Sequence, residues 1–293
     1  DQLIRSFYDR LVIKQLGARV LTDLNGNIQI PKQASSAKAE WLPEGATPQG
    51  SAITTAQIGM SPKRVATFVD YTRQLLLQSS VDVEKLIEDD LKKAVAIAFD
   101  FIALFGEGTA NEPLGIMNIK NLQTVAMTGP LTLDDIIELE TIVSEANAYG
   151  DRMGYLTNAS VRGYLKTLTE SANSSDKIWK LGANGDGVIN GTKAMVSQII
   201  PKTKTLSPIL YGDWSQLLIG EWGPVFLKSN PYIGQSAGIV RIDVEQNADV
   251  ARRHDESFAV IKAADTSVYP EWHTRWLGEG SSPAPRRGRP SPG

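Results

Sequence analysis

Apolar and polar positions follow their most regular pattern in SVDVEKLIEDDLKKAVAIAFDFIALFG, residues 80–106. The apolar residues recur every three or four positions, which is the spacing of one face of an α-helix. The pattern predicts a helix over about residues 81–105, roughly 37 Å long at about 1.5 Å per residue. Gly106 follows the last apolar residue, and we expect it to end the helix in the left-handed conformation that glycine adopts without strain.

Three other stretches have helical spacing. Residues 133–149 carry an apolar stripe, and Thr132 with Asp135 matches the capping box that begins many helices. Residues 159–168 are expected to form a short helix, and residues 1–20 an amphipathic one. The stripe of residues 1–20 consists of Leu3, Ile4, Phe7, Leu11 and Leu16.

Alternation of apolar and polar residues predicts strands in much of the remaining chain. Asn25-Gly26 and Asn190-Gly191 predict hairpins, because both central residues of a type I′ turn need a positive φ. Pro62 divides residues 53–75 into two extended pieces, and residues 239–264 are expected to form one or two long strands. Helices and strands are mixed without a regular βαβ repeat, so the sequence predicts an α+β fold.

Residues 31–52, PKQASSAKAEWLPEGATPQGSA, are rich in Pro, Gly, Ala and Ser. They hold few apolar side chains apart from Trp41 and Leu42, so the segment cannot bury much of itself. Long loops without secondary structure are uncommon inside compact domains. We therefore expect a long excursion away from the core.

Composition narrows the choice of function. The 293 residues are 42% hydrophobic, which is enough for a sizeable core in one large domain or two moderate ones. The 30 basic and 33 acidic residues give a net charge of −3, which implies no strong attraction to nucleic acid or membranes. There is no cysteine, which excludes disulfides and thiolate metal sites. No apolar run approaches the roughly 18 residues that span a bilayer, and no signal peptide is visible.

The glycine-rich stretch GEGT, residues 106–109, raises the question of phosphate binding. A phosphate loop precedes a helix, so that amide hydrogens and the positive end of the dipole face the anion. Here the glycines follow the long helix, and no Gly-Lys-Ser/Thr is present. The sequence therefore predicts a helix terminator rather than a phosphate site.

The strongest enzyme signal is GQSAG, residues 234–238, which matches the nucleophile elbow of α/β-hydrolases around Ser236. Asp243 or Asp249 and then His254 follow in the order of that catalytic triad. The elbow needs a strand before the serine and a helix after it. SNPYI before it is poorly strand-like, and the residues after it alternate like a strand. A tight glycine turn is the favoured interpretation, with a serine hydrolase as an alternative.

Candidate metal ligands are sparse. One of the two histidines, His254, lies in a charged run that is typical of a solvated strand face. Asp23, Asn25 and Asn27 imitate the start of a calcium loop, but Ile28 occupies the position where such a loop requires glycine. We expect no metal, no cofactor and no catalytic site.

Taken together, several stretches resemble the major capsid proteins of tailed bacteriophages, which have the Hong Kong 97 fold. The resemblance covers about residues 11–264, most of the chain, and rests on the order and spacing of the stretches. They are AEWLPEG (39–45), SPKRVATFVDYTRQLL (61–76), the long helix, GEGTANEPLGI (106–116), INGTKAMVSQIIP (189–201), LYGDWSQLLIG (210–220) and FAVIKAA (258–264).

The resemblance implies the parts of that fold. They are an N-terminal arm (1–26), an extended E-loop hairpin (27–61), a peripheral domain with a long spine helix (62–118 and 236–265), an axial domain (119–235) and a C-terminal extension (266–293). In this family the E-loop reaches over neighbouring subunits, which accounts for a long segment without its own core. An upstream scaffolding segment is often removed in relatives, and a chain that opens at Asp1 fits such cleavage or a trimmed numbering equally.

The resemblance also implies a function. Such proteins self-assemble into hexamers and pentamers of an icosahedral shell around double-stranded phage DNA, without catalysis. The implied partners are copies of the same chain, decoration, portal and scaffolding proteins, and DNA held by non-specific contact. The implied location is the virion capsid, assembled in the cytoplasm of the host bacterium. An encapsulin-type nanocompartment shares the fold and stays the nearer alternative, and the serine hydrolase is the further one.

Two sets of residues are the candidate inter-subunit contacts. Trp41, Leu42 and Glu44 lie at the tip of the expected E-loop, where the apolar pair is the anchor we expect on an adjacent subunit. Arg286, Arg287 and Arg289 lie in the tail 278–293, whose composition predicts disorder of the isolated segment. We expect these arginines to meet carboxylates of a neighbouring capsomer.

Overall fold

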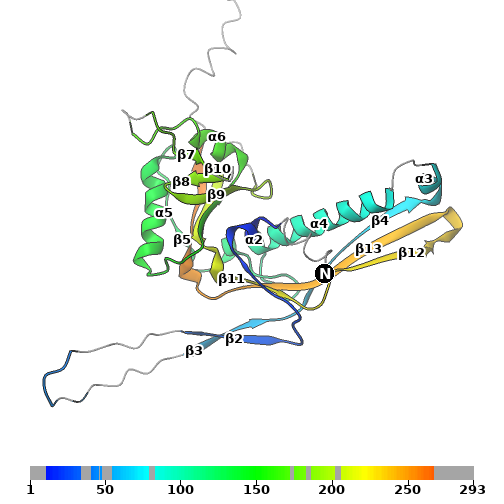
Figure 1. Ribbon diagram of the computed structural model, residues 1–293, viewed down its shortest axis with the longest axis horizontal. Helices are drawn as coiled ribbons and strands as arrows, with labels where there is room; N and C mark the ends of the chain where they lie inside the picture. Colours follow the sequence, from blue (N-terminus) through cyan, green and yellow to red (C-terminus); the bar gives the residue numbers. More distant parts are fainter. Residues whose placement is uncertain are drawn as a thin grey trace, which may run out of the picture.

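The computed structural model describes residues 11–33, 41–45, 47, 55–78, 83–171, 175–182, 186–201 and 206–266. The described residues form a five-stranded sheet, a seven-stranded sheet and a separate two-stranded hairpin. Figure 1 shows an elongated molecule in which one helix, α4 (Val83–Phe105), runs along most of one arm. None of the described helices combines the length and apolarity that crossing a bilayer requires.

The five-stranded sheet is organised around one long strand, β13. On one edge β13 pairs with β4, and on the other edge it pairs first with β12 and then with β11. At about 3.3 Å per residue its 14 residues extend roughly 46 Å. The strands are β1 (Arg19–Leu21), β4 (Lys63–Thr72), β11 (Leu217–Glu221), β12 (Phe226–Gly234) and β13 (Ile239–Arg252).

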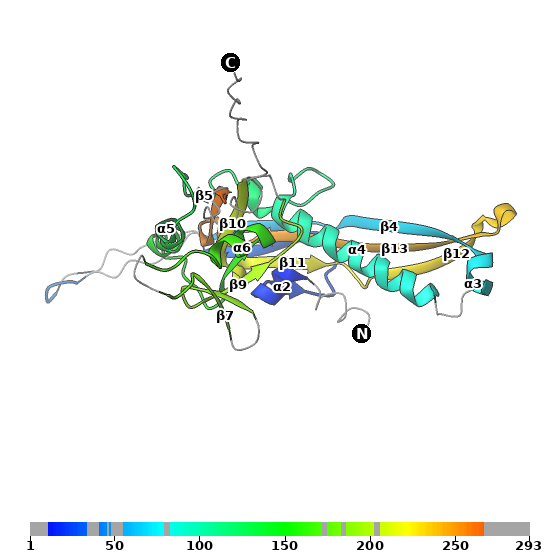
Figure 2. The same cartoon turned by 90° about the horizontal axis from the view of Figure 1, so that it is seen from above.

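Helix α4 covers one face of this sheet, as the view from above in Figure 2 shows. Side chains alternate along β13, so that Val240, Ile242 and Val244 are buried while the residues between them are only partly covered. They share a hydrophobic cluster with Leu91 and Val95 of α4. Alternate residues of the strand thus pack on the apolar stripe of the helix, as expected when a strand with alternating side chains lies against an amphipathic helix.

The seven-stranded sheet is covered on both faces. One face packs on α5 (Leu133–Glu145) and α6 (Ala159–Leu165), and the other face joins the cluster under α4 through residues such as Leu156 and Val260. Its three inner strands, residues 153–157, 206–213 and 258–265, are therefore buried along most of their described length rather than on alternate residues. In sheet order they are β5 (Gln123–Thr124), β14 (Phe258–Asp265), β10 (Leu206–Asp213), β6 (Met153–Thr157), β9 (Thr192–Val196), β8 (Gly187–Ile189) and β7 (Trp179–Leu181).

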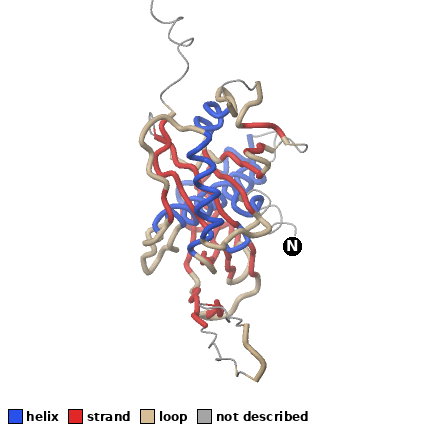
Figure 3. Tube along the Cα trace, turned by 90° about the vertical axis from the view of Figure 1, so that its left-hand side faces the viewer, coloured by secondary structure: helices blue, strands red, loops and turns tan. Residues whose placement is uncertain are grey.

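The two-stranded hairpin consists of β2 (Ile28–Gln33) and β3 (Thr55–Met60). It leaves the body at the end opposite the tip of the α4 arm, and the end view in Figure 3 shows it projecting below the body. The remaining described elements are α2 (Val12–Leu16), α3 (Arg73–Gln78), α5 (Leu133–Glu145), α6 (Ala159–Leu165), and the single 3₁₀ turns η1 (Ile116–Asn118), η2 (Trp214–Gln216), η3 (Gln235–Ala237) and η4 (Asp255–Ser257).

Several predictions from local sequence are confirmed. Helix α4 occupies residues 83–105 of the predicted 81–105, and Thr132 and Asp135 form the capping box of α5. Asn190 and Gly191 have φ values of 47° and 78°, as a type I′ turn between β8 and β9 requires. Pro62 separates β3 from β4.

The first predicted hairpin is wrong. Asn25-Gly26 does not join two paired strands, because β1 pairs in parallel with β11 whereas β2 pairs with β3. The Trp222 indole donates to the Gly26 carbonyl at 2.6 Å, and the Leu24 amide donates to the Glu221 carbonyl at 3.0 Å. These contacts hold the segment against the end of β11, so the turn directs the chain into the projecting hairpin instead.

The predicted N-terminal helix ends earlier than expected, at Leu16 instead of about residue 20. Within the described residues it comprises only Val12–Leu16, and residues 1–10 lie outside the described part of the chain. Gly17, with φ of 125°, ends it, and β1 follows at once. The helical stripe therefore gives way to a strand because Arg19–Leu21 find a partner in β11.

Gly106 ends α4, but not in the left-handed conformation; Gly108, with φ of 73°, adopts that instead. A Cβ at Gly106 would overlap the carbonyl oxygens of Ile102 and Pro113, so glycine is required there for close backbone approach. The Gly115 amide donates to the Gly106 carbonyl at 2.8 Å, and the Asn118 side chain donates to the carbonyls of residues 105 and 106. The last carbonyls of α4 are thus satisfied by a returning loop.

Strand pairing also crosses the expected domain boundaries. β14 was expected with the peripheral part, yet it pairs with β10 and β5 in the other sheet. β11 and β12 were expected in the axial part, yet both pair with β13. The pairing of β14 was not visible in the sequence because an apolar strand can add to either sheet.

The side chain of Asp100, on α4, is buried at 2% exposure in the core. Its carboxylate accepts the amide of Val12 at 2.9 Å and approaches that of Ile13 at 3.5 Å, at the start of α2. The N-cap residue of α2, Leu11, has no side-chain oxygen to do this. Asp100 therefore caps α2 from a distance of 88 residues in sequence.

Replacing Gly106 by alanine should destabilise the subunit by about 1–3 kcal/mol, because the new methyl group overlaps two backbone carbonyls that cannot easily move. Thermal unfolding of dissociated subunits measures the effect. Gly163→Ala is the matched control: it lies within α6 with open space around an added Cβ and should be neutral or stabilising by up to about 1 kcal/mol. Equal melting temperatures for the two variants would contradict this account.

Burial raises the pKa of Asp100 to about 6, against the opposing effect of the two amides. The folded chain therefore holds this proton more tightly than the unfolded chain does. The resulting stability is fully present below the unfolded pKa of about 3.8 and is lost as the pH rises through 6. Between pH 4 and 7 the wild type should lose up to about 3 kcal/mol more unfolding free energy than Asp100→Asn.

Urea unfolding of dissociated subunits across this pH range measures the difference. Burial also raises the pKa of Glu221, to about 7, so both proteins keep the decline that Glu221 causes. Only the difference in unfolding free energy between wild type and Asp100→Asn reports on Asp100. Parallel pH profiles of the two proteins would refute the raised pKa of Asp100.

Candidate assembly surfaces

The connection between β2 and β3 carries the most exposed large side chain of the described residues. Trp41 is 102% exposed and Leu42 41%, and Glu44 beside them is also exposed. Gly45, with φ of 82°, helps to turn the chain here. The structure thus places all three predicted tip residues on the projecting segment, with Trp41 fully exposed and Leu42 partly exposed.

The base of the hairpin packs on the body through a small apolar cluster. Met60 is 2% exposed and lies with Leu218 of β11 and Ala251 of β13, and Ile30 and Ile58 pack against them. A two-stranded hairpin alone is marginally stable in water, so this contact is what holds its root. Beyond the root the described strands pair only with each other.

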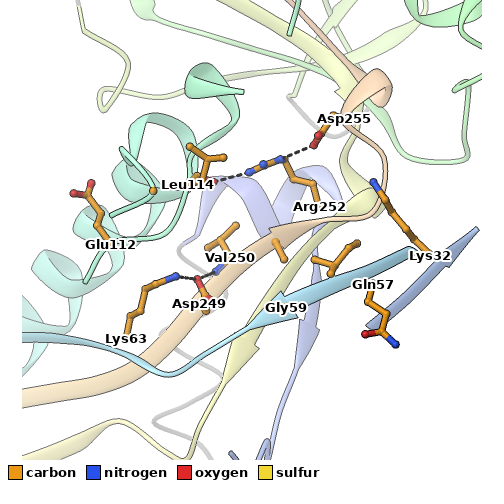
Figure 4. Close-up of a pocket in the computed structure, with 13 residues that line it drawn as sticks. Lys32, Gln57, Gly59, Lys63, Glu112, Leu114, Asp249, Val250, Arg252 and Asp255 are labelled. Carbon is orange, nitrogen blue, oxygen red and sulfur yellow. Dashed lines mark hydrogen bonds and ion pairs between the residues drawn. The ribbon is translucent and has the colours of Figure 1, made fainter. Parts of the chain in front are cut away.

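A buried ion pair stands next to this cluster (Figure 4). The Lys63 ammonium lies 2.8 Å from the Asp249 carboxylate, and their side chains are 16% and 4% exposed. The same carboxylate accepts the amide of Ser61 at 3.0 Å and that of Val250 at 2.9 Å. A buried pair whose oxygens are this well bonded fixes geometry, and loss of one partner typically costs about 3–5 kcal/mol. It therefore sets the direction in which the chain crosses from β3 to β4.

Arg252 forms a second link at the same joint. Its guanidinium donates to the Leu114 carbonyl at 2.6 Å and to the Asp255 carboxylate at 3.0 Å, which ties the loop after α4 to the end of β13 (Figure 4). Together with Lys32 of the hairpin and Glu112 of that loop, these residues line a groove of about 310 Å³. Its central charges are paired with one another, so we interpret it as a structural joint between hairpin and body.

The face of β4, β13 and β12 that points away from α4 is also exposed. Phe68 and Phe226 are 55% and 53% exposed on it. The Arg241 guanidinium lies 3.9 Å from the centre of the Phe68 ring and forms two hydrogen bonds, of 2.6 and 2.7 Å, with Asp70. These bonds lower the pKa of Asp70 and raise that of Arg241. The face therefore combines two open aromatic rings with ordered, paired charges.

Neither this face nor the joint could be recognised from the local sequence pattern alone. A signal for Phe68 was present, because it occupies an outward position between Thr67 and Val69 in the alternation of β4. The partner of Lys63 lies 186 residues away, so no local pattern could reveal it. Arg286, Arg287 and Arg289 lie outside the described residues.

The residues of the hydrolase alternative do not come together. Ser236 lies in η3, the turn between β12 and β13, whereas His254 follows the far end of β13. Asp249 is engaged by Lys63. SNPYI belongs to β12, so the prediction that it is poorly strand-like is wrong, but a strand rather than a helix follows the serine.

Among the described residues no three His, Asp or Glu side chains gather closely enough to hold a metal ion.

Comparison with known proteins identifies relatives along nearly the whole chain. The family model described as the phage capsid family matches residues 1–263. The chain is 32% identical over 262 residues to the major capsid protein of Halomonas phage phiHAP-1, and 23% identical over 283 residues to that of Klebsiella oxytoca phage phiKO2. Each match covers 89% of this chain but only 42% and 65% of those proteins, respectively, so the chain spans less than two thirds of either.

Solved structures agree on the fold. A structure of Microbacterium phage Oxtober96 superposes with a TM-score of 0.70 at 18% identity, over 86% of this chain and 90% of that one. The capsid of a native GTA particle gives 0.67 at 14% identity, over 86% and 89%. With a long helix along a β-sheet arm, a second sheet and a projecting hairpin, the chain has the Hong Kong 97-type α+β fold and belongs to the phage capsid family.

Proposed function

We propose that this chain is the major building block of a tailed-phage capsid, in which its copies form hexamers and pentamers of an icosahedral shell around double-stranded DNA. The observation that carries the proposal is the projecting hairpin segment, on which Trp41 is fully exposed and Leu42 partly exposed. Large apolar side chains held away from the body favour contact with another molecule. The names of both relatives and the C5 symmetry of the GTA capsid structure support a shell with five-fold positions.

We infer that the hairpin tip contacts a different surface of the neighbouring copy rather than another tip. Contacts between two different surfaces of identical chains are heterologous, and they close into rings when the rotation allows it. Rings of five and six copies are the rings that an icosahedral shell needs. Obligate interfaces of this kind bury roughly 2,000–5,000 Å², which a long hairpin supplies more readily than a compact body.

The parts of the chain then have these roles. Residues up to about 26 act as the arm, 27–61 as the E-loop, and the α4 arm with β4, β12 and β13 as the peripheral part. The seven-stranded sheet with α5 and α6 acts as the axial part around the ring axes, and β14 joins it. Decoration, portal and scaffolding proteins complete the particle, and the net charge of −3 fits sparse, non-specific contact with DNA. Assembly takes place in the bacterial cytoplasm, and the protein ends in the virion.

The two other functions have less support. The relatives are phage capsid proteins, which favours a viral shell over a cargo compartment of the same fold. A hydrolase would need Ser236 and His254 together, whereas the length of β13 separates them.

Negative-stain electron microscopy with light-scattering mass tests the proposed capsid function. Uniform shells tens of nanometres across support it, and a persistent monomer in the presence of scaffolding protein would oppose it.

Trp41→Ala should lower the yield of shells by at least tenfold and leave the folded subunit unchanged. The tryptophan is fully exposed in the described part of the chain, so we expect its truncation to remove mainly contacts with a neighbour. Aromatic anchors at interface centres are typically worth about 2 kcal/mol or more. Trp41→Phe keeps a ring at this position and serves as the matched control, with most of the yield retained. Assembly is counted by electron microscopy, and subunit folding by circular dichroism.

Deletion of residues 278–293 should lower the melting temperature of assembled particles but not that of dissociated subunits. The reason is our proposal that Arg286, Arg287 and Arg289 pair with carboxylates of a neighbouring capsomer. Replacing only these three arginines by glutamine should reproduce most of the loss. Particles of wild-type stability after the deletion would exclude such a strap.

A further inference from the structure

Strand β4 forms an open edge of the five-stranded sheet. Among the described strands it pairs with β13 alone, in one unbroken register over its 10 residues, and in the view from above it is the outermost strand of the arm (Figure 2). The other edge strand of the arm, β12, is interrupted by Pro231 and by a shift of register after Asn230. Such irregularities protect an edge from further pairing, whereas a long regular edge is a template for another strand. β4 contains neither proline nor glycine.

The free backbone groups of this edge belong to alternate residues. The Arg73 amide donates to the Gly238 carbonyl at 2.8 Å, and in an antiparallel pair this means that the odd-numbered residues of β4 bond to β13. On the other side of β13 the Trp222 amide donates to the Asn247 carbonyl at 3.0 Å. Asn247 is thus turned away from Arg64, its partner in β4, which gives the same alternation. The residues that direct both amide and carbonyl to the open edge are Arg64, Ala66, Phe68, Asp70 and Thr72.

These groups fit a second copy of the same edge. When two β4 strands run antiparallel about a two-fold axis at Thr67, Arg64 lies opposite Asp70 of the partner subunit. Ala66 lies opposite Phe68 of the partner subunit, and the axis repeats both pairs. Each of these pairs exchanges both of its N–H···O bonds. The edge is therefore self-complementary, as a two-fold contact between identical patches requires.

A neighbouring register fits less well. If the axis moves by one residue, to Phe68, the negative charge of Asp70 faces the methyl group of Ala66. Lys63 then lies opposite Arg73 of the partner subunit, and like charges directly opposite each other are destabilising. The register centred on Thr67 is therefore the one that the charges favour.

Side chains on the open face favour the same register. Arg64 forms an ion pair with Glu245 at 2.6 Å. Arg241 holds Asp70 through two hydrogen bonds. Across the axis Arg64 meets Asp70, so the four side chains form a row in which positive and negative charges alternate. The two Phe68 rings, now 55% exposed, become diagonal neighbours within reach of each other.

We propose that two copies of this chain join through their β4 edges, antiparallel about a two-fold axis at Thr67, so that their two sheets become one continuous sheet. A seam one strand long is small beside the roughly 1,200 Å² of the smallest stable interfaces, so two free subunits associate weakly. Copies held together by other contacts reinforce the seam through their high local concentration. The contact needs only two copies, so the inference stands whether or not the copies close into the proposed shell.

A disulfide across the axis tests the register. The chain has no cysteine, so Thr67→Cys places a single thiol in each copy. In the proposed pairing Thr67 lies opposite its own counterpart in a non-hydrogen-bonded pair, whose Cα atoms are about 4.5 Å apart, within the range that a disulfide spans. After mild oxidation of the concentrated full-length protein, most of this variant should run as a linked dimer on a non-reducing gel.

Thr72→Cys is the matched control, with the same residue type on the same strand. In the proposed pairing the two copies of Thr72 lie about 33 Å apart along the seam, so this variant should give at least tenfold less linked dimer. Thr72 is the more exposed of the two threonines, so random collision would favour it instead. Equal yields from the two variants, or a higher yield from Thr72→Cys, would overturn the proposal.

A charge reversal in the Thr67→Cys protein tests the partner of the edge. Arg64→Glu places an acid opposite Asp70 of the partner subunit and should lower the yield of linked dimer by tenfold or more. Lys228→Glu makes the same change of charge on the same face, but in β12, and should leave the yield unchanged. The Arg64 side chain is 68% exposed, so we expect its replacement to leave folding intact, which circular dichroism verifies. An unchanged yield in Arg64→Glu, or an equal loss in both variants, would refute the contact.

Discussion

The packing of one face of β13 against α4 is the interaction on which the rest of the structure depends. Val240, Ile242 and Val244 cannot be buried unless α4 lies over them, and β4 and β12 gain their places only by pairing with β13. The same strand then reaches Asp249 at the joint and leads through η4 to β14 in the other sheet. The cluster under α4 contains residues of both sheets and so joins them, while a second cluster fills the space between the seven-stranded sheet and the helices α5 and α6.

This rigid core explains how a hairpin can project so far. The strands β2 and β3 have one apolar contact at Met60 and one fixed crossing at Lys63–Asp249, and these define a direction as well as an attachment. A flexible root would spread the hairpin over many orientations, and ordering it on a neighbour would then cost conformational entropy. A root fixed by a bonded ion pair removes part of that cost before any contact is made.

Features with a local physical cause could be predicted from the sequence, and those with a distant cause could not. The helix over residues 83–105, the capping box at Thr132 and the turn at Asn190-Gly191 each depend on neighbours within a few residues. Asn25-Gly26 carries the same signal as Asn190-Gly191, yet contacts with β11 decide its outcome. The tip residue Trp41 was predictable because an apolar pair in a polar segment is visible without the fold. Phe68 was not singled out, because its exposure depends on which face of β4 the helix covers.

Stability and assembly therefore rest on different residues of this chain. Asp249, Gly106 and Asp100 have their partners inside the molecule, so changes there act on the folded subunit first and on any particle through it. Trp41 is fully exposed among the described residues. Burial of its ring can therefore contribute free energy only when another surface covers it. The proposed shell protein would benefit from this separation, because contacts on a projecting segment can be adjusted without disturbing the core of the folded subunit.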